Sequence, residues 1–576
     1  CACLVGSEMC IRDRITTAGP KADIYVFTGS VLENMEEYTA LTGKPLLPPA
    51  WVFEPWAGGG VGRWMDGPTH DVIQEMEGVI RKFKNLDIPH SGLYAEGAGW
   101  KWEDHYNKEE IYKIATFTKQ QKMRVFSWQF SHLDMEQAKE LLPNCAEEDL
   151  PITRTPDYHG EKVLPCAIDF SHPRAEELLE NQWHDRMDAG FDGTMVDFGE
   201  IIPDEAVFYD GRTGDEMHNA YALDYTKAYR KLFEKYKGED HVLFSRSAAA
   251  GVQKHYCQFG GDQLSSFRGL TYAMNGGLTL AASGFPFWGV DAGGYSGFAD
   301  EETYLRWTEF ATFSPIMRFH GVTPREPWAY SRYAVSVYKF YAWLRENLLK
   351  YSVHTAEEAH KTGIPMMRPL PMVFPKDKEA VYWEDEYFYG SDLLVAPVHQ
   401  EGEKRRIYFP SGRWINLLDF RKMVGGNRIF QVDVPIDKIP VYIREGACIL
   451  SVMNGELQLG QSMTYEKKNT VLMSRALNET SGKRYADGKE IEYNILGQTG
   501  EDFFMLRHAF ETEFIVLLGF DRKPESLELN GVSLSEGASL NALNYGSGWY
   551  WREDTAVIVS VPKLEKTEIH VIHKEQ

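Results

Sequence analysis

Residues 193–200 read GTMVDFGE, and this stretch decides how the chain around it is interpreted. Its first four residues are small or apolar, as in a strand that is buried on both faces, and they run directly into Asp197. In parallel barrels the catalytic side chains lie at the carboxyl ends of such strands. The stretch therefore predicts a barrel strand whose end presents Asp197.

Seven further apolar runs lie between residues 51 and 321, and amphipathic stretches separate several of them. The runs start at Trp51, His90, Arg124, His241, His255, Gly284 and Pro315. Helical spacing of apolar residues is clearest at 69–85, 109–122, 173–190 and 222–238. Eight strands with crossover helices predict an α/β fold, a closed (β/α)8 TIM barrel over residues 49–364. A doubly wound open sheet is the alternative.

The sequence pattern changes on either side of this barrel. From residue 365 short alternating strands and turn signals predict a proximal C-terminal β-sandwich over 365–450 and a distal β domain over 451–576. Residues 15–48 contain the strand-like ADIYVFTGS and are interpreted as the remnant of a truncated N-terminal β-sandwich with its linker. Residues 1–14, CACLVGSEMCIRDR, resemble a translated sequencing-adapter tail and are predicted to be an assembly artefact.

Composition narrows the class of protein and its partners. The 576 residues carry a formal charge of −23, which argues against nucleic acid or an anionic membrane as a partner. No apolar run reaches the roughly 18 residues that a membrane-spanning helix needs. Seven cysteines are thinly spread without a CxxC pair, which indicates a reducing compartment and hence a cytoplasmic location. The composition leaves a homo-oligomer open.

Most of the apolar runs end in a polar or ionisable residue. These residues are Glu96, Gln129, Asp197, Arg246, Asp262, Asp291 and His320. Because strand ends converge at one mouth, so many polar groups there would be costly in a purely structural barrel. Two carboxylates at a mouth are what glycosidic bond cleavage needs: one attacks or stabilises the anomeric carbon and the other protonates the leaving oxygen. The structural alternative for Asp197 or Asp262 is a loop or helix cap.

Five motifs follow one another in the order seen in glycoside hydrolase family 31, which the chain resembles from about residue 20 to 450. They are DGTMVDFGE (192–200), FSRSAAAGVQKHYCQFGGDQ (244–263), SGFPFWGVDAGGY (283–295), MRFHGVTPREPWAY (317–330) and GIPMMRPLPMVFP (363–375). The resemblance implies a retaining α-glycosidase that acts on an oligosaccharide or glycoside. It also implies that no metal or organic cofactor is required.

The resemblance assigns the chemistry to particular residues. It implies that Asp197 is the nucleophile and Asp262 the general acid/base. Arg246 matches an arginine that contacts the sugar and the acid/base side, and Glu200 supports the nucleophile loop. Arg246 would favour an ionised Asp197, whereas burial and the charge of Asp197 would keep Asp262 protonated before the first step.

The resemblance also implies the sugar pocket. Asp291 and His320 match residues that hold sugar hydroxyls, Trp288 would form part of the apolar floor, and Trp128 is placed with the substrate-binding residues.

Three positions depart from the usual family pattern. Glu96 stands where α-glucosidases have an aspartate-rich motif, Met195 replaces a tryptophan or lysine, and Phe259 replaces a tryptophan. The sugar therefore stays open: an α-xyloside, an α-glucoside or a relative is expected. Sulfoquinovosidase or α-galactosidase-type specificity, transglycosylation and an inactive sugar-binding barrel are the alternatives.

Overall fold

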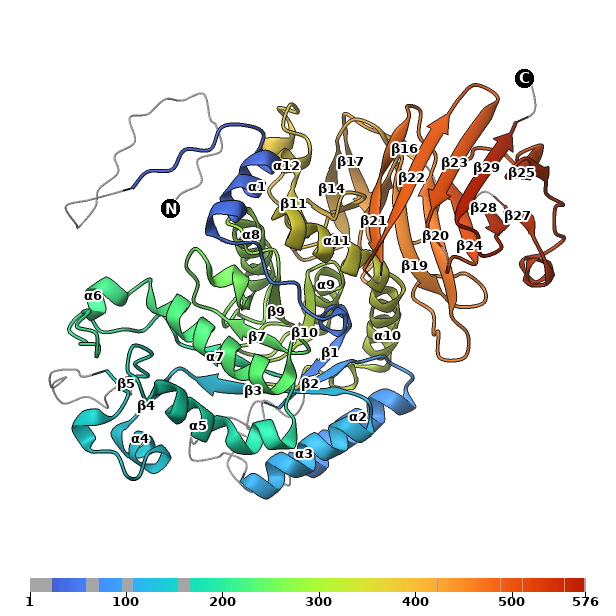
Figure 1. Cartoon of the computed structure of the whole chain (residues 1–576). Helices are drawn as coiled ribbons and strands as arrows, with labels where there is room; N and C mark the ends of the chain where they lie inside the picture. The colour runs from blue at the N-terminus through green and yellow to red at the C-terminus, as the bar shows by residue number, and fades with distance from the viewer. Residues whose placement is uncertain are drawn as a thin grey trace.

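A computed structural model describes residues 23–58, 72–95, 107–153 and 166–573, except residues 422, 487, 510 and 554. Eight parallel strands close into one barrel in the order β1-β10-β9-β8-β7-β6-β3-β2, which confirms the predicted barrel over the open sheet (Figure 1). The strands are β1 (Trp56–Gly58), β2 (Gly92–Ala95), β3 (Arg124–Phe130), β6 (Gly193–Asp197), β7 (Val242–Ser245), β8 (Cys257–Phe259), β9 (Trp288–Ala292) and β10 (Ile316–Phe319). Each lies within one of the eight apolar runs.

Helices cover the outside of the barrel. They are α2 (Val72–Asn85), α3 (Lys108–Gln120), α5 (Ala175–Ala189), α7 (Tyr221–Lys237), α8 (Phe267–Ala282), α9 (Glu301–Thr312), α10 (Arg332–Asn347) and α11 (Leu349–Thr362). The four stretches with predicted helical spacing overlap α2, α3, α5 and α7. Local signals set their ends: Asn107 and Glu110 form a capping box at the start of α3, and Gly190 ends α5 with a φ of 86°. A short excursion after β3 contains β4 (His132–Leu133), α4 (Met135–Leu141) and β5 (Cys166–Ala167).

Strand β6 shows how alternation sorts its side chains. Met195 packs inside the barrel with the rings of Phe126 and Phe244, whereas Val196 packs outside in a cluster with residues of α7. Gly193 leaves no room for a Cβ between the Phe126 ring and the Val242 carbonyl. Because side chains alternate along a strand, Asp197 points to the same side as Met195, at the end where the barrel opens.

Trp288 lies on the other side of the barrel wall. Its ring is fully buried and packs against Gly277 of α8, where it leaves no space for a Cβ. This position differs from the expected sugar floor, and the reason is strand parity: Trp288 and Asp291 are three residues apart in β9, so their side chains point to opposite faces.

The C-terminal region consists of antiparallel sheets. The proximal part has a six-stranded sheet, β11-β12-β13-β18-β15-β16, and the pair β14-β17. The distal part has sheets β19-β20-β24-β28-β27 and β21-β22-β23-β29-β25-β26, which enclose one shared apolar core. Figure 1 shows the distal strands, orange to red, beside α10 and α11. The bounds of the first group are β11 (Met367–Pro369), β12 (Tyr387–Tyr389), β13 (Leu393–Val395), β14 (Lys404–Phe409), β15 (Arg413–Asn416), β16 (Met423–Gly425), β17 (Arg428–Asp433) and β18 (Val441–Arg444).

The distal sandwich follows directly. Its strands are β19 (Cys448–Met453), β20 (Lys468–Ser474), β21 (Thr480–Ala486), β22 (Lys489–Gly497), β23 (Glu501–Arg507), β24 (Phe514–Leu518), β25 (Ser526–Leu529), β26 (Val532–Ser533), β27 (Gly548–Arg552), β28 (Ala556–Ser560) and β29 (Lys566–Ile572).

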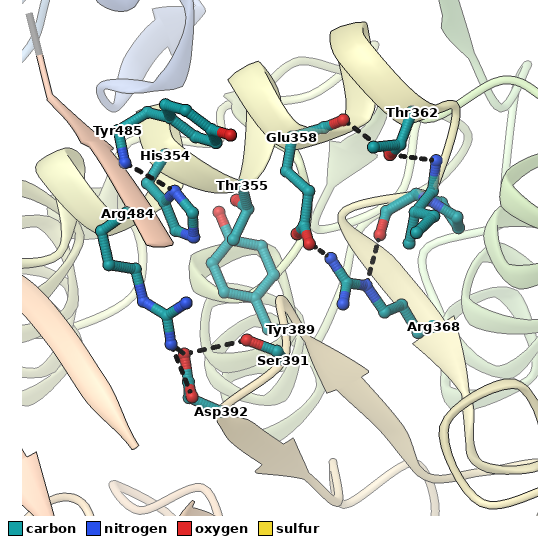
Figure 2. A network of polar contacts seen from close by, with 12 residues as sticks. His354, Thr355, Glu358, Thr362, Arg368, Tyr389, Ser391, Asp392, Arg484 and Tyr485 are labelled. Atoms are coloured by element: carbon teal, nitrogen blue, oxygen red, sulfur yellow. Dashed lines mark hydrogen bonds and ion pairs between the residues drawn. The ribbon is translucent and has the colours of Figure 1, made fainter. Parts of the chain in front are cut away.

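A buried polar network joins the distal sandwich to the proximal sheet and to α11. Figure 2 shows Arg484 of β21 reaching Asp392, whose two carboxylate oxygens accept from Nη2 at 3.0 and 2.8 Å. Next to this pair, the Tyr485 N–H donates to Nδ1 of His354 on α11 at 3.0 Å. Both members of the ion pair are about 95% buried (each 5% exposed), so the contact is shielded from solvent screening.

The N-terminal part differs from the expectation in one respect. Residues 23–30 form no strand, and helix α1 (Val31–Thr42) follows them, capped by Ser30 and Glu33. The apolar letters IYV at 24–26 suggest a strand, but these three side chains are exposed and the described residues provide no partner strand. Residues 1–14, like 15–22, lie outside the described residues. Over the described ranges, no helix combines the length and the apolar character that crossing a membrane requires.

The packing of Trp288 against α8 can be tested at two adjacent glycines of that helix, Gly276 and Gly277. Gly277→Ala should lower stability by about 1–3 kcal/mol, because the new methyl group overlaps the indole ring. Gly276→Ala should raise it by about 1 kcal/mol, because nothing lies within 4 Å and alanine favours the helix. Unfolding midpoints of the two variants check this, and equal shifts in one direction would contradict the packing described.

Candidate active site

Asp197 ends β6 in a nest of hydrogen-bond donors. The residue is 7% exposed. Its Oδ1 lies 3.2 Å from Nε of Arg246 and accepts from the Phe198 N–H at 3.0 Å. Its Oδ2 accepts from the Trp128 indole N–H at 3.2 Å. Two N–H donors and an adjacent cation favour the ionised form of this carboxylate, and the donors fix the direction of both oxygens.

The turn after Asp197 is built to receive Arg246. Phe198 has a φ of 63°, uncommon for a bulky residue, and the Arg246 guanidinium lies 4.0 Å from the centre of its ring. Gly199 packs against the ring of Tyr225 with no space for a Cβ. Glu200 then accepts from Nε of Arg246 at 2.6 Å. Arg246 therefore bridges Asp197 and the more exposed Glu200.

Asp262 lies on the loop after β8 and is exposed. In the barrel wall β7 separates β6 from β8, so Arg246, which follows β7, stands between the positions of the two aspartates. The loop that carries Asp262 is hydrogen-bonded to the loop after β9: the carbonyl of Gln263 accepts from the N–H groups of Tyr295 and Ser296 at 2.8 and 3.0 Å.

A buried ion pair lies inside the barrel below these loops. Arg318 of β10 donates through Nη2 to Asp291 of β9, and each residue is 1% exposed. The guanidinium is surrounded by the rings of Tyr94, Phe259 and Phe244, whose centres lie 5.2, 5.6 and 5.8 Å from its Cζ. Cation–π contacts of this kind help to offset the removal of the charge from water.

These surroundings shift the pKa values of the carboxyl groups. Burial raises the pKa of Asp197 overall, although Arg246 and the two N–H donors oppose the rise. Desolvation in the mouth raises the pKa of Asp262, against Arg246 and Arg318. Burial raises the pKa of Asp291 to about 6 despite Arg318. Arg246 thus acts on both aspartates of the mouth, as expected for a cation between them.

Several other expected residues gather at the same end of the barrel. Met195 accepts from the Tyr94 hydroxyl at 3.7 Å from its sulfur, and Phe259 lies against Arg318. His320 is buried with its ring 4.6 Å from that of Tyr94, and burial lowers its pKa well below the usual value.

Two of the expected mouth residues lie elsewhere, and a third cannot be placed. Gln129 points outward, where its side-chain oxygen accepts from Nη1 of Arg186 on α5 at 2.9 Å. Trp288 lies against α8, as described above. Glu96 falls outside the described residues.

Sequence reasoning missed Arg318, Tyr94 and Phe198. A signal for Arg318 exists: it stands two residues before His320, so strand alternation directs both to the same face. Tyr94 of β2 lies two residues before Glu96 in the same way. Nothing in the local sequence predicts the positive φ of Phe198.

The arrangement suits displacement at a carbon that carries a leaving group. A buried carboxylate held by two N–H donors and a cation can attack, and a nearby exposed carboxyl of raised pKa can donate a proton and exchange it with water. The described residues contain no group of three or more His, Cys, Asp or Glu side chains that could hold a metal ion.

Two sequence models of known protein domains match this chain. Residues 45–355 match the sequence model of the glycosyl hydrolases family 31 TIM-barrel domain, and residues 363–449 match that of the glycosyl hydrolase family 31 C-terminal domain. Together these matches cover the barrel and the proximal sheets.

Curated relatives are similar over most of the chain. An isomaltosyltransferase of Sporosarcina globispora is 27% identical over 93% of this chain and 54% of its own length. An α-xylosidase of Emericella nidulans is 29% identical over 77% of this chain and 58% of its own length. The chain thus spans little more than half of these relatives.

A solved structure shares the fold. The cycloalternan-forming enzyme from Listeria monocytogenes superposes with a TM-score of 0.81 at 24% identity, over 94% of this chain and 56% of that one. A likeness at this identity shows the fold alone.

The pair Arg318–Asp291 generates a stability test. Asp291→Asn and Arg318→Met should each cost about 3–5 kcal/mol, because each leaves a buried polar or charged partner uncompensated. The double variant should lose less than the sum, by about 0.5–3 kcal/mol. Because the pKa of Asp291 is about 6 in the fold and lower in the unfolded chain, stability falls as pH rises from the unfolded value to about 6 and does not change further above it. Arg318→Met removes the cation that lowers this pKa, so it should be more harmful at pH 8 than at pH 5. Unfolding midpoints of the single and double variants at both pH values check these expectations. Strictly additive losses in the double variant would contradict the pairing.

Proposed function

We propose that this chain, which belongs to glycoside hydrolase family 31, is a retaining α-glycosidase with Asp197 as nucleophile and Asp262 as general acid/base. One observation carries the proposal: the buried carboxylate of Asp197 is held by Arg246, Trp128 and the Phe198 N–H at the end of a barrel strand. A structural cap has no need of a cation and two N–H donors on an aspartate that faces the open end of a barrel.

The chemistry follows from the two carboxyl groups. One oxygen of Asp197 attacks the anomeric carbon while Asp262 gives its proton to the leaving glycosidic oxygen, and a covalent glycosyl–enzyme ester forms. Asp262, now ionised, takes a proton from water, whose oxygen attacks the same carbon and releases Asp197. Two inversions at one carbon retain its configuration. During the ester stage Arg246 keeps a carboxylate partner in Glu200.

A neutral sugar is the substrate class that the pocket supports. Among the residues that the structure describes, the arginines that contact carboxylates of the site are Arg246 and Arg318, and both are already engaged. A sulfonate would have to compete with those carboxylates for its own cation. We therefore infer an α-xyloside, an α-glucoside or a related neutral glycoside, with Met195, Phe259 and Glu96 as the residues that select the sugar.

Transfer to a sugar acceptor is a second candidate, favoured by one observation. The similarity to an isomaltosyltransferase extends over 93% of the chain, more than the 77% matched by the α-xylosidase. Hydrolysis and transfer share the first step and differ only in whether water or a sugar hydroxyl attacks the ester. Chromatography of products formed at high concentrations of an α-linked glucan separates them: longer oligosaccharides indicate transfer, and monosaccharide alone indicates hydrolysis.

The nucleophile assignment is tested with p-nitrophenyl α-glycosides of glucose, xylose, galactose, N-acetylgalactosamine and sulfoquinovose. Asp197→Ala should lower kcat on the substrate that is turned over by about 10⁴-fold or more, without changing the circular dichroism spectrum. Asp204→Ala, in an exposed position of the same loop, is the matched control and should keep activity. Full activity of Asp197→Ala would refute the proposal, and a response to the sulfoquinovoside alone would refute the neutral substrate.

The charge of Arg246 should set the acid limb of the pH profile. Arg246 lowers the pKa of Asp197, which must be ionised to attack, so Arg246→Met should move the acid limb of kcat/KM to higher pH. Glu200→Gln should move it to lower pH, because Arg246 then has only Asp197 to compensate. Shifts in the same direction for both variants would contradict the shared-cation geometry.

A further inference from the structure

We propose that Arg325 is a positioning residue of the reaction, which fixes the loop that carries Asp262. The inference rests on the proposed function in one respect, since it takes Asp262 as the acid/base. Arg325 follows β10 within MRFHGVTPREPWAY, far from Asp262 in sequence, and is 4% exposed.

The Arg325 guanidinium joins the loops after three neighbouring strands. Toward the loop after β9, Nη2 donates to the carbonyls of Gly294 and Gly297 at 2.6 and 3.0 Å, and Nε donates to Gly294 at 2.9 Å. Toward the loop after β8, Nη2 donates to Oγ of Ser265 at 2.9 Å. Toward its own loop, Nη1 donates to the carbonyl of Thr323 at 3.1 Å. A planar fork of donors is suited to hold several carbonyls at once.

Two further sets of backbone hydrogen bonds connect the loop after β9 to the chain that follows Asp262. The N–H groups of Tyr295 and Ser296, next to Gly294, donate to the carbonyl of Gln263 at 2.8 and 3.0 Å. In return the Ser265 N–H donates to the carbonyl of Ser296 at 2.9 Å. Gln263 is the residue directly after Asp262, so the chain is held one residue and three residues beyond the carboxylate.

The glycines of the loop after β9 make this approach possible. Gly294 has a φ of 80°, and its α-carbon lies so close to the backbone of Ser265 that a Cβ has no space. Gly321, in the third loop, likewise leaves no space for a Cβ beside the Arg325 guanidinium. Three loops therefore meet at backbone distance around one cation.

Backbone positioning matters more for Asp262 than for Asp197. Asp197 belongs to a strand and is held by two N–H donors and the Arg246 cation, whereas Asp262 is an exposed loop residue whose direction depends on how its loop is held. A proton must pass to an oxygen in a narrow range of positions, and a displacement of about 1 Å costs on the order of 10²-fold in rate. Arg325 is thus expected to act on the proton-transfer step and hardly on nucleophilic attack.

Arg345 provides a matched control for a purely structural arginine. It is 1% exposed and donates to the carbonyls of Phe53, Thr312 and Ser314 at 2.6, 3.0 and 2.7 Å. These carbonyls precede β1 and β10, at the end of the barrel opposite the mouth. Loss of either arginine should lower stability, but only loss of Arg325 should alter acid catalysis.

The experiment compares Arg325→Gln, Arg325→Lys and Arg345→Gln with wild type and Asp262→Ala in the full chain. Two α-glycosides of the active sugar are used, one with a dinitrophenyl leaving group that needs no proton and one with a methyl leaving group that does. Hydrogen exchange of peptides spanning 260–268 and 293–299 is followed by mass spectrometry at a temperature where every variant is folded.

We expect Arg325→Gln to resemble a mild Asp262→Ala. Its kcat/KM on the methyl glycoside should fall about 10²-fold, and on the dinitrophenyl glycoside much less, with faster exchange in both peptides. Arg325→Lys, which keeps one cation but not the fork, should recover part of the loss. Arg345→Gln should affect both substrates equally and leave exchange in the two peptides unchanged.

Unchanged exchange in 260–268 would overturn the proposal, and so would faster exchange with equal losses on both substrates. The proposed function fails by a different result: full activity of Asp197→Ala. Because the exchange measurement needs no turnover, it decides whether Arg325 holds the loop even in that case.

Discussion

The ion pair between Arg318 and Asp291 is the constraint on which the mouth of the barrel depends. A charge pair at 1% exposure is tolerated only where geometry and surrounding groups compensate its desolvation. Here the barrel supplies one partner from β10 and the other from β9, and aromatic rings from β2, β7 and β8 enclose the cation. The ion pair therefore links closure of the barrel to the polarity of the pocket, because a shift in any of these strands would break the enclosure of the pair.

Arg246 and Arg318 act on the carboxylates of the site from different depths in the barrel. Arg246 lies at the rim, where it contacts Asp197 and Glu200, and Arg318 lies inside the barrel with Asp291. Both lower the pKa of Asp262, which desolvation raises. Asp197, the proposed nucleophile, is buried, and Asp262, the proposed proton donor, is exposed. This asymmetry suits one group that must not meet water early and another that must exchange a proton with it.

Strand alternation explains most of what could and could not be predicted from the sequence. The apolar runs predict all eight barrel strands, because parallel strands buried on both faces have continuous apolar sequences. Proximity to a strand end predicts Gln129 at the mouth, and the family resemblance implies Trp288 in the sugar floor, although parity directs both outward. Parity would also have found Arg318 from His320. The hold of Arg325 on the Asp262 loop depends on loops distant in sequence, and no local pattern indicates such contacts. The apolar residues at 24–26 predict a strand, but they are exposed and form none, since a strand-like composition needs a pairing partner.

The buried contact of Arg484 with Asp392 bears on how far the C-terminal sandwiches can be regarded as interchangeable modules. Each partner belongs to a different sandwich, and His354 of α11 adjoins them (Figure 2). A distal sandwich inherited from another protein would leave Asp392 as an isolated buried anion unless it brought an arginine at the same place. In evolutionary terms, recombination at the boundary near residue 450 is therefore restricted to donors that already carry the matching cation. The barrel, the proximal sheet and the distal sandwich are then expected to be inherited as one unit.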